Sequence, residues 1–301
     1  MKYIFSTIIG SFVLDQNVDI TDSLPSEADL LHKYPGTKPL PTEKIPIVLA
    51  HFKDKKYFKE FYSKNRALTI TAIRNSVSAD VFIMQAIANL AELDVSANLL
   101  SKRLREWYGW YAPEVAEQIT DHQHFAELIG KKNKKELFQE LKINAEESMG
   151  AALDKNHVDE ILLVAKQITL LYQLRQQHEE YLRQVMKHYC PNLLELAGVT
   201  LGAKLIEMAR GLKHLALLPA STIQLLGAEK ALFRHIKTGS RSPKHGIIIN
   251  HPLVQNVSKE DKGKAARILA DKLSLCARLD YFKGEFKAPE YRQELEKKLR
   301  K

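Results

Sequence analysis

The sequence predicts a mainly α-helical protein in three parts: a small N-terminal α/β domain with linker helices (1–112), a long antiparallel coiled-coil hairpin (113–190) and a helical C-terminal domain (191–301). Three observations predict this arrangement. Apolar runs separated by turn residues open the chain, helical spacing of apolar residues follows, and an excess of basic residues marks the last third. With 301 residues, of which 45% are hydrophobic and 27% charged, the chain can build real cores and is not a disordered polymer.

The first seventy residues are expected to form a small α/β unit. Residues 1–20 are rich in Ile, Phe, Val and Tyr, and Asp15-Gln16-Asn17 is a turn signal between two apolar runs, so a β-hairpin is expected. The prolines between residues 21 and 46 predict a loop with a short helix at most. The short apolar run Ile47–Ala50 is expected to be a third strand.

Helical periodicity begins after this unit and continues to the end of the chain. Helices are expected over 80–93 and 96–108, where an aspartate and a serine can act as N-caps. A proline that suits a first helical turn begins the next helix, 113–129, and a further apolar helix is expected over 136–142. The segment Glu146–Gly150 is expected to be a connection.

The longest predicted helix covers 158–189. Its apolar seam steps by three and four residues through Ile161, Val164, Ile168, Leu171, His178, Leu182, Val185 and Tyr189. Arg175 is a polar position in this seam, and Pro191 ends the helix. At 1.5 Å per residue the helix is about 48 Å long, which is typical of a coiled-coil arm. We expect the 114–142 region to run back alongside it, and the seam to pair internally or with a second copy of the chain.

The sequence contains no motif of a nucleotide-binding or catalytic site, since it has neither a Walker loop nor a Gly-x-Gly-x-x-Gly fingerprint. The pair His188-x-Cys190 supplies too few ligands for zinc, and the residues of His122-x-His124 diverge on a helix. Two distant cysteines predict no disulfide framework and a reducing compartment. We therefore expect no catalytic residue, no metal, no cofactor and no intrinsic enzymatic activity.

The start of the chain has some features of a signal peptide, because Lys2 precedes the apolar run Tyr3–Leu14. No small-residue cleavage site follows this run, however, and polar residues interrupt it. No stretch reaches the roughly 20 apolar residues of a membrane span. We expect two strands around the turn at Asp15-Gln16-Asn17 instead of a signal peptide, no membrane partner and a cytoplasmic location.

The net charge of +9 is confined to one part of the chain. Residues 191–301 contain 21 Lys and Arg against 11 Asp and Glu, a net charge of +10, whereas residues 1–190 contain 24 against 25. Because residues 1–190 are nearly neutral and residues 191–301 are basic, we expect electrostatic binding to be a property of the C-terminal part. A basic domain usually binds a partner rich in phosphate.

The densest basic cluster lies on a predicted helix, 228–237, which Gly239 ends. Lys230, Arg234 and Lys237 are four and three residues apart, so they form one stripe on this helix. The apolar residues of the helix are expected to face the core: Leu232, Phe233 and Ile236.

A basic loop follows at Ser240–Gly246 and contains Arg241, Lys244 and His245. Glycines on either side let backbone N–H groups approach a phosphate, while arginine and lysine supply charge. Few aromatic residues interleave with these charges, so recognition of shape and phosphates in folded RNA is favoured over stacking on single strands. A solvated basic face without a ligand is the alternative. Helices over 260–280 and 289–300 are expected to complete the domain.

At these residues the sequence resembles the Nop family, the core proteins of box C/D small ribonucleoproteins, and in particular its archaeal members. The matching run is LLPASTIQLLGAEKALFRH at 217–235, followed by KTG at 237–239 and PKHG at 243–246. Shorter family-like runs are REWYGW at 105–110, SMG at 148–150, PNL at 191–193 and DYF at 280–282. The resemblance covers nearly the whole chain from about residue 67 and is weakest over 1–65. Ser240 and Ser242 depart from the alanine and proline usual in the family.

The resemblance implies a function for each part. The N-terminal domain would bind the methyltransferase fibrillarin, which carries S-adenosylmethionine, and the coiled coil would pair two copies. The helical Nop domain would bind a box C/D guide RNA together with a small kink-turn-binding protein of ribosomal-protein type. The chain would then be a scaffold for 2′-O-methylation of target RNA in an archaeal cytoplasm.

The RNA-binding candidates combine the physical cluster with the family motifs at 227–230 and 231–234. They are Gln224, Gly227, Lys230, Arg234, His235, Lys237, Arg241, Lys244 and His245. As an alternative to RNA contact, the two histidines are packed and hydrogen-bonded within the protein. For the Gln224 amide, the alternative is that it caps a loop. Three other functions stay open: a coiled-coil adaptor whose basic domain binds acidic protein, a ribonucleoprotein of splicing-factor type, and an enzyme with an unrecognised site.

Overall fold

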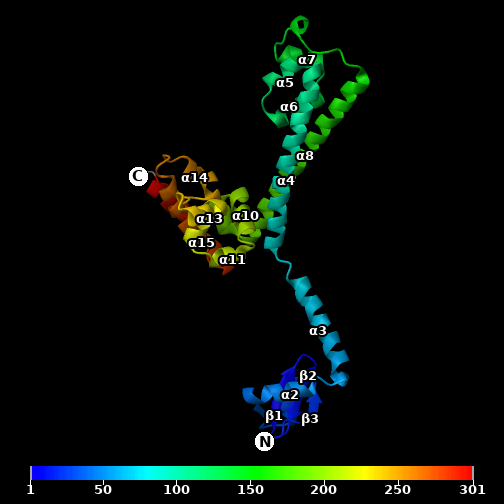
Figure 1. Cartoon of the computed structure of the whole chain (residues 1–301), viewed down its shortest axis with the longest axis vertical. Coiled ribbons are helices and arrows are strands. Elements are labelled where there is room, and N and C mark those ends of the chain that lie inside the picture. Colours follow the sequence, from blue (N-terminus) through cyan, green and yellow to red (C-terminus); the bar gives the residue numbers. More distant parts are fainter. Residues whose placement is uncertain (1, 300–301) are drawn as a thin grey trace. The chain divides into compact units, whose positions relative to one another are not determined.

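The computed structural model describes residues 2–299, which form two compact units that divide between Ser78 and Ala79 (Figure 1). This division does not coincide with the predicted boundaries at 112 and 190. The reason is that helix α4 (Ala79–Tyr111) packs against the later helices of the second unit. Each unit is described separately below.

The N-terminal unit contains a four-stranded sheet in the order β3-β2-β1-β4. Its strands are β1 (Tyr3–Thr7), β2 (Gly10–Leu14), β3 (Ile20–Leu24) and β4 (Lys38–Pro39). The predicted turn at Asp15 is present and joins β2 to β3, with its carboxylate accepting the N–H groups of Asn17 and Asp19 at 2.9 Å. The apolar run before it folds as a second hairpin, β1–β2, which the sequence interpretation missed.

The helices of this unit are α1 (Glu27–Lys33), the 3-10 turn η1 (Thr42–Lys44), α2 (Ile45–His51) and the longer α3 (Lys55–Asn75). Helices α1 and α2 each pack one buried residue against the sheet, whereas α3 buries none. The predicted third strand at Ile47–Ala50 is wrong, because these residues lie in α2. Pro46 occupies the first turn of α2, and Val48 is its buried residue, packed with Leu14 of the sheet. A run of four apolar residues fits a helix or a strand equally well, so periodicity could not decide between them.

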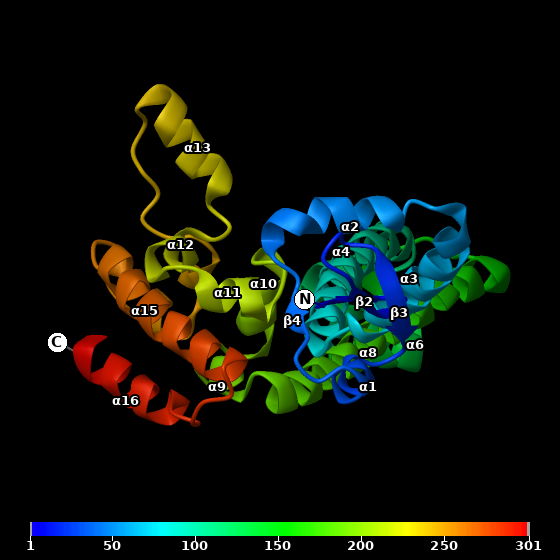
Figure 2. The same cartoon turned by 90° about the horizontal axis from the view of Figure 1, so that it is seen from below.

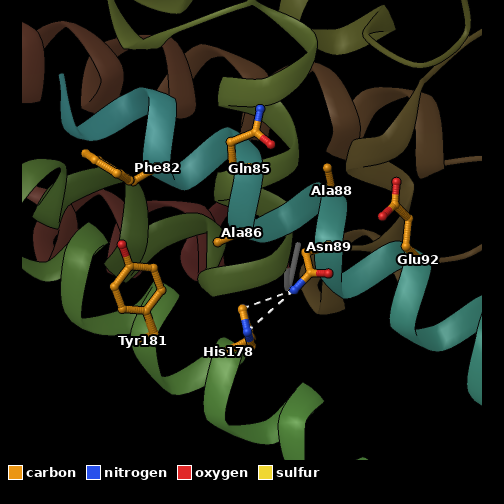
Figure 3. A pocket seen from close by; sticks show the side chains of 8 residues that line it. All are labelled: Phe82, Gln85, Ala86, Ala88, Asn89, Glu92, His178 and Tyr181. Carbon is orange, nitrogen blue, oxygen red and sulfur yellow. Dashed lines mark hydrogen bonds between the residues drawn. The ribbon is translucent and has the colours of Figure 1, made fainter. Parts of the chain in front are cut away.

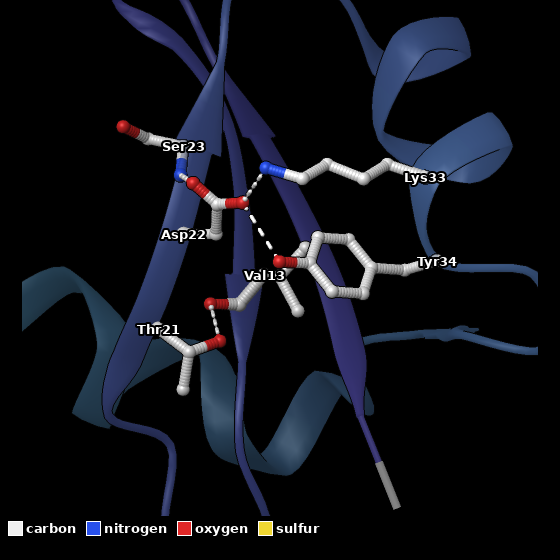
Figure 4. Close-up of polar contacts among 6 residues, drawn as sticks. All are labelled: Val13, Thr21, Asp22, Ser23, Lys33 and Tyr34. Atoms are coloured by element: carbon white, nitrogen blue, oxygen red, sulfur yellow. Dashed lines mark hydrogen bonds and ion pairs between the residues drawn. The ribbon is translucent and has the colours of Figure 1, made fainter.

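A polar cluster ties β3 to the end of α1 (Figure 4). The carboxylate of Asp22 accepts hydrogen bonds from Lys33 Nζ at 2.7 Å and from the Tyr34 hydroxyl at 2.8 Å. These donors lower the pKa of Asp22 to about 2, the Lys33 hydrogen bond contributing most. Next to Asp22 in β3, the Thr21 hydroxyl donates to the Val13 carbonyl of β2 at 3.0 Å. The cluster fixes an edge of the unit by local contacts and has no catalytic geometry.

The second unit begins with an antiparallel hairpin of two long helices, α4 and α8 (Lys155–Tyr189) (Figure 1). The expectation of a long helix ending before Pro191 is confirmed, and its seam residues Ile161, Ile168 and Leu182 are buried. The seam of α8 packs along α4, and its first half also packs against α6 (His122–Lys131), where Ile161 and Ile168 share a core with Phe125 and Ile129. The predicted packing of the 114–142 region beside the long helix is therefore confirmed for that half, whereas α4 as the main partner was not predicted.

The two helices predicted over 80–93 and 96–108 are one continuous helix, α4. Asp94, close to the predicted break, instead accepts a hydrogen bond from Arg175 Nε of α8 at 2.5 Å. Arg175 also donates to Glu179 at 3.0 Å. The polar position in the apolar seam is therefore satisfied across the two helices, and α4 passes through it without interruption.

Three short helices and a 3-10 turn close the far end of the hairpin: α5 (Pro113–Gln118), α6 (His122–Lys131), α7 (Lys134–Glu140) and η2 (Ala145–Glu147). Pro113 begins a helix as predicted, but the expected helix 113–129 breaks into α5 and α6. Asp121 caps α6, and Arg105 donates to the carbonyls of Ala116 and Thr120 at 2.7 and 2.8 Å at the break. The guanidinium of α4 thus satisfies the carbonyls that the end of α5 leaves without helical partners.

The rest of the unit is a helical domain built around α15 (Lys262–Tyr281). Its other elements are α9 (Pro191–Ala197), α10 (Val199–Met208), α11 (Leu212–Leu217), α12 (Ala220–Leu225), α13 (Glu229–Thr238), η3 (Ile247–Asn250), α14 (Pro252–Gln255) and α16 (Ala288–Leu299). The buried Asp280 of α15 accepts from the backbone N–H groups of Asn192 and Leu193 at 3.0 and 2.8 Å, which satisfies the start of α9. One apolar core joins this domain to the base of the hairpin.

Candidate RNA interface

Helix α13 leaves the helical domain and buries none of its residues (Figure 2). It follows Gly227, at φ +86°, and ends as predicted at Gly239, which adopts the left-handed conformation at φ +67°. The expectation that its apolar residues face the core is wrong. Phe233 and Ile236 are 58% and 72% exposed, and Leu232 is half-buried. The core is already closed by α12 and α15, so no layer remains for α13 to cover.

The predicted basic stripe lies on this projecting helix. Lys230, Arg234 and Lys237 are all exposed, and among residues 2–299 none of them has an acidic partner within ion-pair distance. The Lys237 ammonium lies 4.8 Å from the centre of the Phe233 ring, a cation–π contact that leaves its charge available. The stripe is therefore a set of uncompensated positive charges.

The loop after α13 returns to the domain at two adjacent backbone hydrogen bonds. Gly246 N–H donates to the Gln224 carbonyl and Ile247 N–H donates to the Leu226 carbonyl, both at 2.7 Å. The Gln224 side chain adds a third bond, from Nε2 to the Lys244 carbonyl at 2.6 Å. The amide thus takes the loop-capping position that was one of its two predicted roles, and it holds Lys244 at the domain surface.

Two other candidate residues have internal contacts. The ring of the half-buried His235 hydrogen-bonds through Nδ1 to the Ser240 carbonyl, which fixes the turn after α13. Glu229 accepts the N–H of Gly227 at 2.7 Å, so the acidic residue of the GAEK run shapes the first turn. His245 is half-buried, and Arg241 is exposed on the loop.

A basic pocket adjoins the loop and contains residues that sequence reasoning missed. A cavity of about 590 Å³ is lined by Gln224, Ser242, Pro243, Lys244, Glu260, Gly263, Lys264 and Arg267. The side chain of Lys244 lies directly over Gly263, where an added Cβ would be 3.3 Å from it. Lys264 and Arg267 come from the first turns of α15 and are exposed. Their three-residue spacing was a visible signal, but only the fold places them beside the loop.

Three cations elsewhere in the domain, Lys272, Lys287 and Arg292, are paired with acids. Lys272 bonds Glu294 at 2.6 Å, and Arg292 lies 3.5 Å from Glu195. The cations of α13, its loop and the start of α15 have no such partners in the described chain, apart from Glu260 at the rim of the basic pocket. The unpaired cations of α13, its loop and the start of α15 therefore form a cluster of net positive charge, which is the electrostatic pattern of a phosphate-binding surface.

The hairpin offers surfaces of a different kind. The outward side of α8 carries an apolar stripe at steps of seven, four and seven residues: Leu163, Leu170, Leu174 and Tyr181, which are between 39% and 50% exposed. Leu163 and Leu170 also line a cavity of about 510 Å³ between α6 and α8. Such spacing is typical of a helix that packs against another helix.

A second groove lies where α4 and α8 meet near Phe82 and Tyr181 (Figure 3). Its polar contact is between Asn89 Nδ2 and His178 Nδ1, 3.2 Å apart. His178 belongs to the predicted seam and is explained by this pairing. The groove brings together no nucleophile and base, so it supplies no catalytic arrangement.

Within residues 2–299, no three His, Cys, Asp or Glu side chains converge in a way that could hold a metal ion. Cys190 and Cys276 are both buried, and burial raises the pKa of each thiol, that of Cys276 to about 12. Over the same residues, no helix combines the length and apolar content needed to cross a bilayer.

Over residues 89–301 the sequence matches the family described as Nop, snoRNA binding domain, fibrillarin. The chain belongs to the Nop family. This Nop chain is 40% identical over 272 residues to a NOP5 family protein of Methanocaldococcus jannaschii, covering 85% of this chain and 66% of the relative. It is 43% identical over 215 residues to Nucleolar protein 58 of Schizosaccharomyces pombe, covering 67% of this chain and 42% of that protein.

The Nop chain spans about two fifths to two thirds of the length of these relatives. A crystal structure described as a fibrillarin/Nop5p complex aligns with 99% of this chain and 98% of its own, at 23% identity and a TM-score of 0.48. The family match covers every residue of the basic surface but leaves out the N-terminal unit.

Proposed function

We propose that this Nop chain is an RNA-binding, non-catalytic scaffold of an archaeal box C/D guide ribonucleoprotein. Its C-terminal domain binds the guide RNA, and its N-terminal unit recruits fibrillarin, which carries S-adenosylmethionine and methylates the 2′-hydroxyl of the target RNA. The supporting observation is the group of uncompensated cations on α13, its loop and the start of α15. The complex acts in the archaeal cytoplasm.

The two sides of α13 suit two partners at once. The cations face phosphates, while the exposed Phe233 and Ile236 need an apolar surface. A guide RNA that already carries a kink-turn-binding protein of ribosomal-protein type offers both surfaces side by side. Binding such a pre-assembled particle explains why one short helix exposes charge and large apolar side chains together.

The salt dependence of RNA binding tests the proposal. Each phosphate contact contributes a slope of about −0.7 to −0.9 to the log–log plot of affinity against salt, because counterions are released. Arg234→Ala with Lys237→Ala should therefore flatten the slope by about 1.4 to 1.8 units for a box C/D guide RNA. The control is Lys287→Ala with Arg292→Ala, which removes the same charge from acid-paired positions. An unchanged slope in the first variant places the RNA elsewhere.

An adaptor whose basic face binds acidic protein is the competing function. Pull-downs from cell extract with and without nuclease distinguish the two, since partners of an RNA scaffold are lost on RNA digestion and partners of an adaptor are kept. Methyl transfer to target RNA should require fibrillarin. Transfer by this chain alone, without fibrillarin, would reveal an enzymatic site and refute the scaffold role.

We also propose that two copies of the chain associate through the hairpin, by way of the outward stripe of α8. The inner seam of α8 is already used by α4, whereas the outward stripe stays 39–50% exposed and has the spacing of a helix-packing surface. Light scattering of the full chain should give about twice 34.3 kDa. Leu170→Asp with Leu174→Asp should return the monomer mass, while Leu68→Asp, on the exposed side of α3, should not. A wild-type monomer at micromolar concentration would contradict this pairing.

A further inference from the structure

Both tryptophans of the chain line a single cavity near the far end of the hairpin. Trp107 and Trp110 come from the last turns of α4, and His157 and Glu160 come from the first turns of α8, with Leu153 and Ile161 completing the wall. The cavity measures about 390 Å³. Trp107 is half-buried, whereas Trp110 is 67% exposed, so one indole forms the floor and the other stands at the surface.

The segment beside Trp110 is held by several contacts. Ala151 N–H donates to the Trp110 carbonyl at 2.8 Å. Glu114 of α5 accepts from Met149 N–H at 2.7 Å and from the Ser148 hydroxyl at 3.1 Å. A Cβ at Gly150 would lie 2.1 Å from the Tyr111 carbonyl oxygen, so the segment runs against the end of α4 with no space between them. Met149 is 85% exposed on this constrained backbone, two residues before Ala151, which bonds the Trp110 carbonyl.

The chemistry of the lining points to a cationic ligand. The faces of indole rings carry negative electrostatic potential and attract ammonium and guanidinium groups more strongly than the other aromatic side chains do. Glu160 is the charged side chain of the lining, it is exposed, and it has no ion-pair partner among residues 2–299. Two indoles and one uncompensated carboxylate thus converge on a space that holds a long side chain.

We propose that this cavity binds the arginine or lysine side chain of a basic segment on a partner protein. The cationic head lies against the indoles and pairs with Glu160, while its aliphatic stem and neighbouring residues contact Met149 and Leu153. Tryptophan and arginine are among the residues most enriched at the hot spots of protein interfaces, where such side chains fill pockets. The pocket lies at the opposite end of the hairpin from α13, so it is separate from the basic surface (Figure 1). Its carboxylate also disfavours the phosphates of RNA.

Intrinsic fluorescence tests this proposal directly, because both tryptophans of the chain report on the pocket. The full chain is titrated at physiological salt with a blocked decapeptide that alternates arginine and glycine, and separately with tetramethylammonium as a minimal cation. We expect a saturable fluorescence change with the arginine peptide and a weaker one with tetramethylammonium. Glu160→Gln keeps both indoles and should weaken peptide binding about tenfold, as expected for the loss of one desolvated charge contact.

The matched control is Glu117→Gln, which removes the same charge from an exposed position on α5 outside the pocket. It should leave the peptide affinity unchanged, and Trp110→Phe should weaken it while guide-RNA affinity stays the same in all variants. The proposal is overturned if no saturable change occurs, if the control weakens binding as much as Glu160→Gln, or if a peptide with glutamine in place of arginine binds equally well. The last result would identify an apolar occupant.

Discussion

Gly246 offers a way to displace the basic loop without changing a single charge. An alanine Cβ at this position would lie 1.8 Å from the Leu226 carbonyl oxygen, whereas real Cβ contacts stay beyond 3.0 Å. The loop and α12 must therefore separate by about 1.2 Å, the difference between 3.0 and 1.8 Å. This movement breaks the two 2.7 Å backbone bonds at the return of the loop. At about 0.5–1.5 kcal/mol net for each bond, Gly246→Ala should lower the free energy of unfolding by about 1–3 kcal/mol.

The same variant should weaken RNA binding, because Lys244 moves with the loop. Loss of one phosphate contact flattens the salt slope of guide-RNA binding by about 0.7 to 0.9 units. Urea unfolding and filter binding over a salt series measure the two effects. Gly109→Ala is the control, since its Cβ meets nothing within 4 Å in α4 and should be neutral or stabilising by about 0.5–1 kcal/mol. A Gly246→Ala chain with the parent's unfolding curve and salt slope would refute the reasoning.

Two further predictions concern buried titratable groups. His251 is neutral in the fold, with Nε2 donating to the Leu196 carbonyl at 2.9 Å and Nδ1 accepting from Leu253 N–H at 3.2 Å, and burial lowers its pKa below 6.5. The unfolded chain therefore binds a proton at this histidine more readily than the folded chain does. The free energy of unfolding should fall as the pH drops below about 6.5. In urea titrations at several pH values, His251→Gln should show a shallower fall. Equal pH dependence in both chains would contradict this assignment. Burial raises the pKa of the thiols of Cys190 and Cys276, so neither should react with a disulfide reagent near pH 8 until urea unfolds the chain. Rapid reaction in the folded state would show that the thiols are accessible.

Local signals predicted the helix ends well. Pro113 and Pro191 begin helices because the missing N–H is not needed in a first turn, and Gly239 ends α13 because it accepts a left-handed backbone. The basic stripe of α13 was equally visible, since three- and four-residue spacing places side chains on one face of any helix. These features depend on residues within one or two turns, which a sequence displays directly.

Contacts between distant residues were not visible in the sequence. Whether α4 stops near Asp94 depends on Arg175, which lies 81 positions later in the chain. The exposure of Phe233 depends on other helices having already closed the core, and spacing alone wrongly assigned it to that core. Lys264 and Arg267 join the basic surface only because the loop after α13 returns beside the start of α15. The charges were known from the sequence, but their gathering into one surface required the fold.

The chain leaves the helical domain after α12 and returns beside it at Gly246. This arrangement separates the stability of the domain core from the helical state of α13. Because the bonds from Gly246 to Gln224 and from Ile247 to Leu226 close the base of the segment carrying α13, the domain core is complete without it. A ten-residue helix with no buried side chain gains little stability from the domain and is marginal in water by itself. Its helical state is therefore set by whatever partner covers it, and amide exchange in α13 should slow on assembly while that of α15 stays constant. The segment can change in length or sequence without affecting whether the rest of the domain folds.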